Sequence, residues 1–160
     1  MYDRNKAVAY AQKWALARNP AYYNFDALGG DCTSFVSQCL YAGGGIMNTT
    51  PDVGWFYKSL NSRSAGWSGV EFLHKFLVNN KGKGPYATVV PLKDVQAGDI
   101  IQLSFDGIKF GHSLFVVGIR HFAVPENVFV ATHTYDSINR PLSSYMYDSY
   151  RVLHINGFRY

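Results

Sequence analysis

The feature that most constrains the fold of this chain is a change in its hydrophobic pattern near Tyr86. Before this residue apolar side chains recur at helical spacing, and after it they alternate as in β-strands. Helices are expected over residues 4–18, 32–41 and 67–79, and strands over residues 87–90, 100–105, 111–120, 128–134 and 150–155. Helices followed by an antiparallel sheet are the α+β pattern, so we predict N-terminal helices packed on a C-terminal antiparallel β-sheet.

Three stretches lack either pattern. Residues 46–66 are rich in loop formers and are expected to run over the surface, where such segments often line a substrate cleft. Residues 81–85 are expected to break the chain between helix and sheet, and residues 138–142 are expected to form a loop.

The composition fits one folded unit. With 160 residues, 48% of them hydrophobic and 16% charged, the chain can bury a sizeable core and is not expected to be disordered. We therefore expect a single domain over residues 1–160. No apolar run approaches the roughly 20 residues of a membrane span. Residues 1–11 are polar and helical in period, unlike a signal peptide.

The charge balance bears on the partners. The formal net charge is +4, and the Lys and Arg residues are scattered along the chain rather than clustered. Nucleic-acid-binding proteins usually carry a basic stripe, so no nucleic-acid partner is expected. A weak attraction to an anionic polymer such as a bacterial cell wall is compatible with this charge.

A cysteine stands at the predicted start of the second helix. Gly29 and Gly30 form a turn, Asp31 has a side chain that caps helix starts, and Cys32 follows. A thiol beside free N–H groups and the positive end of a helix dipole is expected to have a lowered pKa and to be nucleophilic. Asp31 has two interpretations: it caps the helix, with its carboxylate held by backbone N–H groups, or it binds a substrate ammonium.

The second cysteine belongs to the same helix. Cys39 lies seven positions after Cys32, about 10 Å along a helix axis, which is too far for a disulfide. Two cysteines also give no zinc signature. Cys39 falls on the apolar face, so we expect it in the core.

A cysteine nucleophile needs a base and a group that orients the base. His112 and His133 are the candidates, because both fall on predicted neighbouring strands that can face the helix of Cys32. Each is also compatible with a purely structural role. The other three histidines are expected to be structural or exposed: His74, His121 and His154.

Several motifs, in order, resemble those of the bacterial putative amidase domain family. They are the Gly-Gly-Asp-Cys-Thr-Ser-Phe-Val-Ser-Gln run at 29–38, Gly-Asp-Ile-Ile-Gln at 98–102, Gly-His-Ser at 111–113 and Thr-His-Thr at 132–134. Residues 2–14 resemble the first helix of that family, so the resemblance covers nearly the whole chain. The family is similar to the NlpC-type and CHAP cell-wall hydrolases, which have a papain-like fold.

The resemblance implies roles for particular residues. Cys32 matches the nucleophile, His112 the general base, and His133 the orienting residue, with Asp136 and Asn139 as alternatives for that third position. Tyr23, with Tyr22 as its neighbour, matches a tyrosine near the oxyanion. Asp31 and Ser34 at the helix start are further candidates for substrate or oxyanion binding.

The resemblance implies cysteine-dependent hydrolysis of an amide bond in peptidoglycan peptides, without a metal or organic cofactor, by an extracellular or cell-wall-associated bacterial protein. Two alternatives stay open. One is an inactive module of the same fold that binds cell-wall fragments through Trp55, Trp67 and the tyrosines. The other is acyl or peptide transfer to a nucleophile other than water.

Overall fold

The computed structural model describes residues 1–160 and is an α+β structure, as predicted. The helices are α1 (Arg4–Trp14), α2 (Cys32–Gly44), α3 (Ala65–Ser68) and α4 (Val70–Asn79). The strands are β1 (Tyr57–Ser59), β2 (Ser62–Arg63), β3 (Gly84–Val90), β4 (Ile100–Ser104), β5 (His112–Ile119), β6 (Val128–Thr132), β7 (Ser137–Pro141) and β8 (Ser149–Arg159).

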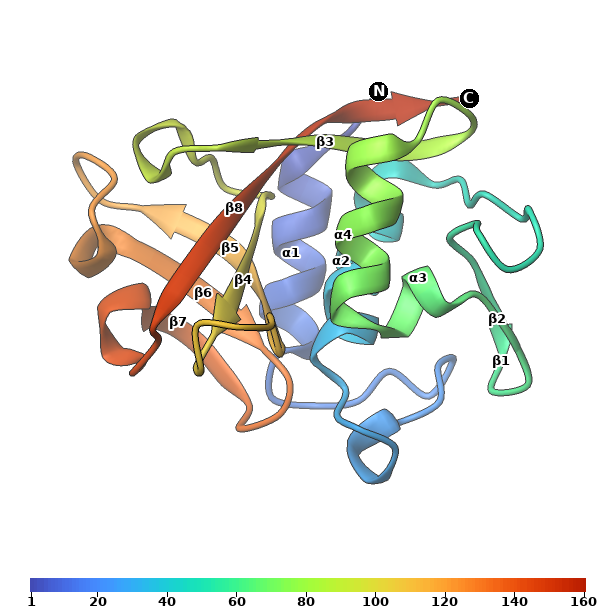
Figure 1. Cartoon of the computed structure of the whole chain (residues 1–160), viewed down its shortest axis with the longest axis horizontal. Coiled ribbons are helices and arrows are strands. Elements are labelled where there is room, and N and C mark those ends of the chain that lie inside the picture. The colour runs from blue at the N-terminus through green and yellow to red at the C-terminus, as the bar shows by residue number, and fades with distance from the viewer.

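Six strands form one antiparallel sheet. Its order is β3-β8-β4-β5-β6-β7, and β1 and β2 form a separate two-stranded hairpin. The long strand β8 crosses the molecule and brings the C-terminus next to the N-terminus (Figure 1). Tyr160 fastens the two ends, because its hydroxyl donates to the backbone carbonyl of Met1 at 3.0 Å.

The helices pack on one face of the sheet. Alanines of α1, the apolar residues of α2 and the leucines of α4 share a core with inward residues of the central strands, including Ile100, Phe115 and Leu153. The opposite face has its own apolar cluster, which includes Leu103, Leu114 and Val116 and is closed by short turns around Leu92 and Leu142. Successive side chains of β4 and β5 therefore pack into two different apolar cores, one on each face of the sheet.

Helix α2 packs against α1, and in Figure 1 it lies behind α4. All residues from Cys32 to Leu40 are buried, so the helix is covered on every side rather than on one apolar face. Its polar residues have partners: Ser37 Oγ accepts from Trp55 Nε1 at 3.0 Å, and Gln38 Oε1 accepts from the Tyr10 hydroxyl at 2.6 Å. These bonds keep the buried polar groups of the helix satisfied.

Most predicted elements are confirmed, and the exceptions have local causes. The third predicted helix is two helices, α3 and α4, because Gly69 between them is extended. Residues 138–142 were expected as a loop but mostly belong to β7, an edge strand whose bulge and final proline hide any alternation. Strand β3 begins at Gly84, within the expected break, and β1 and β2 lie within the expected loop 46–66.

Candidate active site

Helix α2 begins at Cys32 because two glycines turn the chain sharply before it. Gly29 and Gly30 have φ values of +89° and +102°, in the region that favours glycine. A Cβ on Gly30 would lie 2.9 Å from Thr134 Oγ1, so the close approach of this second segment also requires glycine. Thr134 Oγ1 accepts from the backbone N–H of Asp31 at 3.2 Å, which ties the helix start to the end of β6.

The Cys32 thiol occupies the first helical position and is nearly covered, with 6% of the residue exposed. Burial raises the pKa of the thiol, and hydrogen bonds from the backbone of Ser113 and from Thr33 lower it only in part. The expected lowering of this pKa is therefore wrong, because loss of solvent raises the pKa by more than the hydrogen bonds to the sulfur lower it. At neutral pH Cys32 is a thiol rather than a thiolate.

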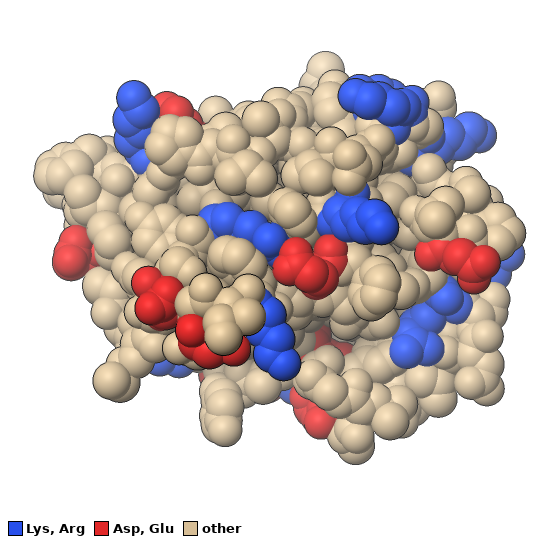
Figure 2. Space-filling model, in the orientation of Figure 1, with Lys and Arg blue, Asp and Glu red and all other residues tan.

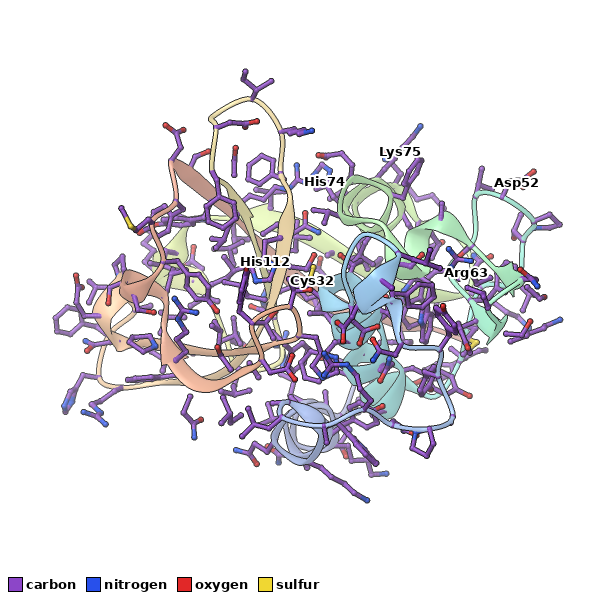
Figure 3. The ribbon with its side chains drawn as sticks, turned by 90° about the horizontal axis from the view of Figure 1, so that it is seen from below. Cys32, Asp52, Arg63, His74, Lys75 and His112 are labelled. Carbon is purple, nitrogen blue, oxygen red and sulfur yellow. The ribbon has the colours of Figure 1, made fainter.

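His112 is the first residue of β5 and directly precedes Ser113, whose backbone reaches the Cys32 thiol. Figure 3 shows Cys32 and His112 at the same junction of helix and sheet, whereas Asp52 and Arg63 lie away from it. Burial, and then the charge of Arg140, lowers the pKa of His112 to about 4. The imidazole is therefore neutral at physiological pH and can accept a proton.

Thr132 determines which nitrogen of His112 carries the ring proton. Its Oγ1 lies 2.9 Å from the carbonyl of Ser113 and 2.8 Å from that of His133, both of which can only accept. With its single proton given to a carbonyl, this hydroxyl can only accept from His112 Nε2, 3.4 Å away. Assigned from these partners, the ring proton is on Nε2, and Nδ1 has a free lone pair.

His133 does not reach His112. Its ring stacks on Phe35 of α2 with centroids 4.1 Å apart. Nδ1 hydrogen-bonds Asp31 Oδ2 at 2.5 Å, and Nε2 hydrogen-bonds the Trp14 carbonyl at 2.7 Å, so neither nitrogen is available to orient another ring. The expected role of His133 as orienting residue is not supported. The residue instead joins the end of α1 to the start of α2.

Asp31 fits its expected capping role only in part, and the structure gives no support to the second role. It stands at the N-cap position, but its side chain accepts no hydrogen bond from the helix. Its carboxylate is fully buried, accepts from the backbone N–H of Phe25 at 2.8 Å and pairs with His133. A substrate ammonium has no access to it.

The alternatives for the third position also lie elsewhere. Asp136 forms a two-pronged pair with Arg18 at 2.8 and 3.0 Å. Asn139 is exposed in β7, with a φ of +52° at the bulge. Neither side chain hydrogen-bonds His112.

The predicted substrate residues near the helix start are also occupied. Ser34 Oγ is buried and accepts from Trp67 Nε1 at 3.3 Å and from Gln38 at 3.2 Å. Tyr23 packs edge-on against Phe25, and its hydroxyl forms no hydrogen bond in the protein. Tyr22 stacks on Trp67 within the aromatic cluster. None of these three contacts Cys32 through a hydrogen bond.

The residues proposed for cell-wall binding are in the core. Trp55 and Trp67 are both 0% exposed and pack against each other, with ring centroids 4.9 Å apart. They cannot offer a sugar-stacking surface. Cys39 is also 0% exposed, as predicted.

Three residues at the site were not predicted from the sequence to have a functional role: Ser113, Thr132 and Arg140. Ser113 and Thr132 lie in the histidine motifs themselves, one after His112 and one before His133. That adjacency was an available signal, because both residues belong to the motifs that located the site. Nothing in the sequence places Arg140 near His112.

The wider surface offers few further features. Basic and acidic side chains are interspersed on the face seen in Figure 2. No three or more His, Cys, Asp and Glu side chains gather in an arrangement that could hold a metal ion. None of the helices has the length and apolar character needed to cross a membrane.

Comparison with known proteins adds a family. A family model described as a putative amidase domain matches residues 1–156. An uncharacterized Bacillus subtilis protein, YhbB, is 37% identical over 139 residues, which are 85% of this chain and 42% of that protein. The chain thus spans less than half the length of this relative. No solved structure matches.

Proposed function

This chain belongs to the putative amidase domain family, and from that premise we propose that it hydrolyses amide bonds with Cys32 as nucleophile and His112 as general base. The observation that carries the proposal is the meeting of α2 and β5. Thr33 and Ser113, 80 positions apart, are hydrogen-bonded at 2.9 Å, so the backbone segments that carry Cys32 and His112 lie side by side. Both reactive groups keep a small exposed fraction, 6% and 8%.

The first half of the reaction forms an acyl-enzyme. The free Nδ1 of His112 takes the Cys32 proton while Sγ attacks the amide carbonyl carbon. The carbonyl oxygen becomes an oxyanion beside the Cys32 backbone N–H, which has no partner within the helix because it lies in the first turn. The imidazolium of His112 then protonates the leaving nitrogen, and the C–N bond breaks to leave a thioester.

The second half releases the acid. His112 removes a proton from water, the oxygen attacks the thioester carbon, and the C–S bond breaks as the proton returns to sulfur. Thr132 keeps Nδ1 free through both steps by holding the proton on Nε2. The thiol and imidazole share no direct hydrogen bond without substrate, and such contacts often tighten only when substrate binds.

We extend the proposal to the fold type and the substrate. A helix bearing Cys against an antiparallel sheet bearing His supports a papain-like arrangement of the NlpC and CHAP type. That similarity supports peptidoglycan peptides as the substrate class, and a place of action outside the bacterial cell or at its wall.

The test is digestion of purified peptidoglycan, with mass spectrometry of the products. We expect new amine and carboxylate ends in equal amounts from the unaltered protein and none from Cys32→Ala. Cys39→Ala is the matched control, because it removes a core thiol and should keep turnover. Cleavage by Cys32→Ala would refute the nucleophile.

Two other outcomes bear on the wider proposal. An added amine such as glycine should not appear in the products, and its incorporation would identify a transferase instead of a hydrolase. Cysteine-dependent cleavage of unrelated peptides, with peptidoglycan left intact, would refute the substrate class alone.

A further inference from the structure

A row of polar side chains leads from the protein surface to the Cys32 thiol. It comprises Arg151 on β8, Gln102 on β4, Ser113 on β5 and Thr33 on α2, and the last three are at most 1% exposed. Arg151 Nη2 lies 2.6 Å from Gln102 Oε1, Gln102 Nε2 lies 3.3 Å from Ser113 Oγ, Ser113 Oγ lies 2.9 Å from Thr33 Oγ1, and Thr33 Oγ1 lies 3.8 Å from Cys32 Sγ.

The orientation of the Gln102 amide is determined at both of its ends. A guanidinium has only donors, so Gln102 Oε1 accepts from Nε and Nη2 of Arg151. The amide nitrogen faces the Val70 carbonyl at 3.0 Å, which can only accept. Its second proton is therefore left for Ser113 Oγ.

The two hydroxyls continue the same direction. Ser113 Oγ accepts from Gln102, and its own proton has one remaining acceptor, Thr33 Oγ1. Thr33 Oγ1 in turn has Cys32 Sγ as its remaining partner. This is the one order in which every proton of the row has an acceptor, and it ends with an O–H directed at the sulfur.

We propose that these four residues form a donor relay that stabilises the Cys32 thiolate as His112 removes its proton, an inference that rests on the proposed role of Cys32. A hydrogen bond to a charged acceptor is stronger than one to a neutral acceptor, and bonds in a buried chain polarise one another. The relay thus favours the transient anion more than the resting thiol. All four are positioning residues.

The outer end of the relay is a fixed cation. Arg151 pairs with Glu71 at 2.8 Å and lies over the Phe110 ring, 3.9 Å from its centroid. Two titratable groups lie closer to the thiol. Asp31, which directly precedes Cys32, raises the pKa of the Cys32 thiol. The second group is His112, the first residue of β5. The relay opposes the effect of Asp31 and of burial.

The relay is tested by the pH dependence of Cys32 alkylation with iodoacetamide, in a Cys39→Ala background so that one thiol reports. Thr33→Val keeps the side-chain shape and removes the O–H. We expect its alkylation rate at about pH 7 to fall about tenfold, through a higher thiol pKa. Thr33→Ser keeps the donor and should restore most of the rate. Arg151→Met should lower the rate by a smaller factor, about threefold.

Equal rates and pH midpoints for Thr33→Val and the unaltered protein would overturn the relay. If Thr33→Val does not fold by circular dichroism, Ser113→Ala interrupts the same row and should lower the rate by an intermediate factor, because Thr33 keeps its O–H beside the sulfur. Alkylation needs no substrate, so the relay is judged apart from turnover. If Thr33→Val raises the thiol pKa but the unaltered protein leaves peptidoglycan intact, the proposed function alone is refuted. If the unaltered protein cleaves peptidoglycan but Thr33→Val leaves the thiol pKa unchanged, the relay alone is refuted.

Discussion

Replacing His112 by Asn should remove a large part of the loss of stability that the protein suffers in mild acid. Burial and the charge of Arg140 lower the pKa of His112 from 6.5 to about 4. The unfolded chain therefore binds a proton on this residue at a higher pH than the native protein does. Stability from this group is fully present above pH 6.5 and is lost as the pH falls toward 4.

The size of the effect follows from the two pKa values. At about 1.36 kcal/mol for each pH unit, the whole shift corresponds to about 3 kcal/mol of unfolding free energy. Between about pH 7.5 and about pH 4.5 the contribution of His112 is about 2.5 kcal/mol. A single domain has only about 5–15 kcal/mol in total, so the effect is measurable.

The assay is urea unfolding followed by circular dichroism at both pH values. The free energy of unfolding should fall less in His112→Asn than in the unaltered protein, by about 2.5 kcal/mol. His121→Asn is the control, because His121 is exposed and its φ of +61° suits asparagine. An equal fall in His112→Asn and the unaltered protein would refute the assignment of His112 as a buried neutral imidazole.

Three further changes bear on the site. Thr132→Val should lower kcat about tenfold and move the ring proton of His112 in ¹⁵N NMR, whereas Thr132→Ser should preserve both; an unmoved proton would exclude the orienting role. Arg140→Met should raise the pKa of His112, seen as an acid limb of kcat/KM shifted to higher pH, and an unshifted limb would contradict the charge effect. Asp31→Asn should lower the unfolding free energy by about 3 kcal/mol in urea, because it leaves His133 without its buried partner, and a loss below about 1 kcal/mol would contradict this.

Several elements could be predicted because their signals are local. The glycine pair before Cys32 predicted a helix start there, and α2 begins at that residue. Alternation located β4, β5 and β6 to within a few residues. The edge strand β7 was missed because a bulge breaks its period and no neighbour covers its outer side. Trp55 and Trp67 were considered as surface residues because their burial depends on helix packing.

The residue that contacts His112 could also not be identified from the sequence, although the motif that contains it was. His133 and Thr132 are adjacent, and residue type favoured the histidine. Strand β6 ends at Thr132, and His133 lies in the turn that follows, so the two side chains reach different parts of the structure. The side chain that does so is the threonine, while the histidine is held by Asp31 and Trp14.

The sequence by itself determined the order of helices and strands, the position of the thiol at a helix start, and the membership of the family, because each depends on residues close together in the chain or on a motif. The tertiary structure alone decided the burial of Cys32 and His112, the side chain that contacts the imidazole, and the row of polar side chains behind the thiol. These depend on burial and on partners from distant segments, which change the free energy of a charge without leaving a local pattern.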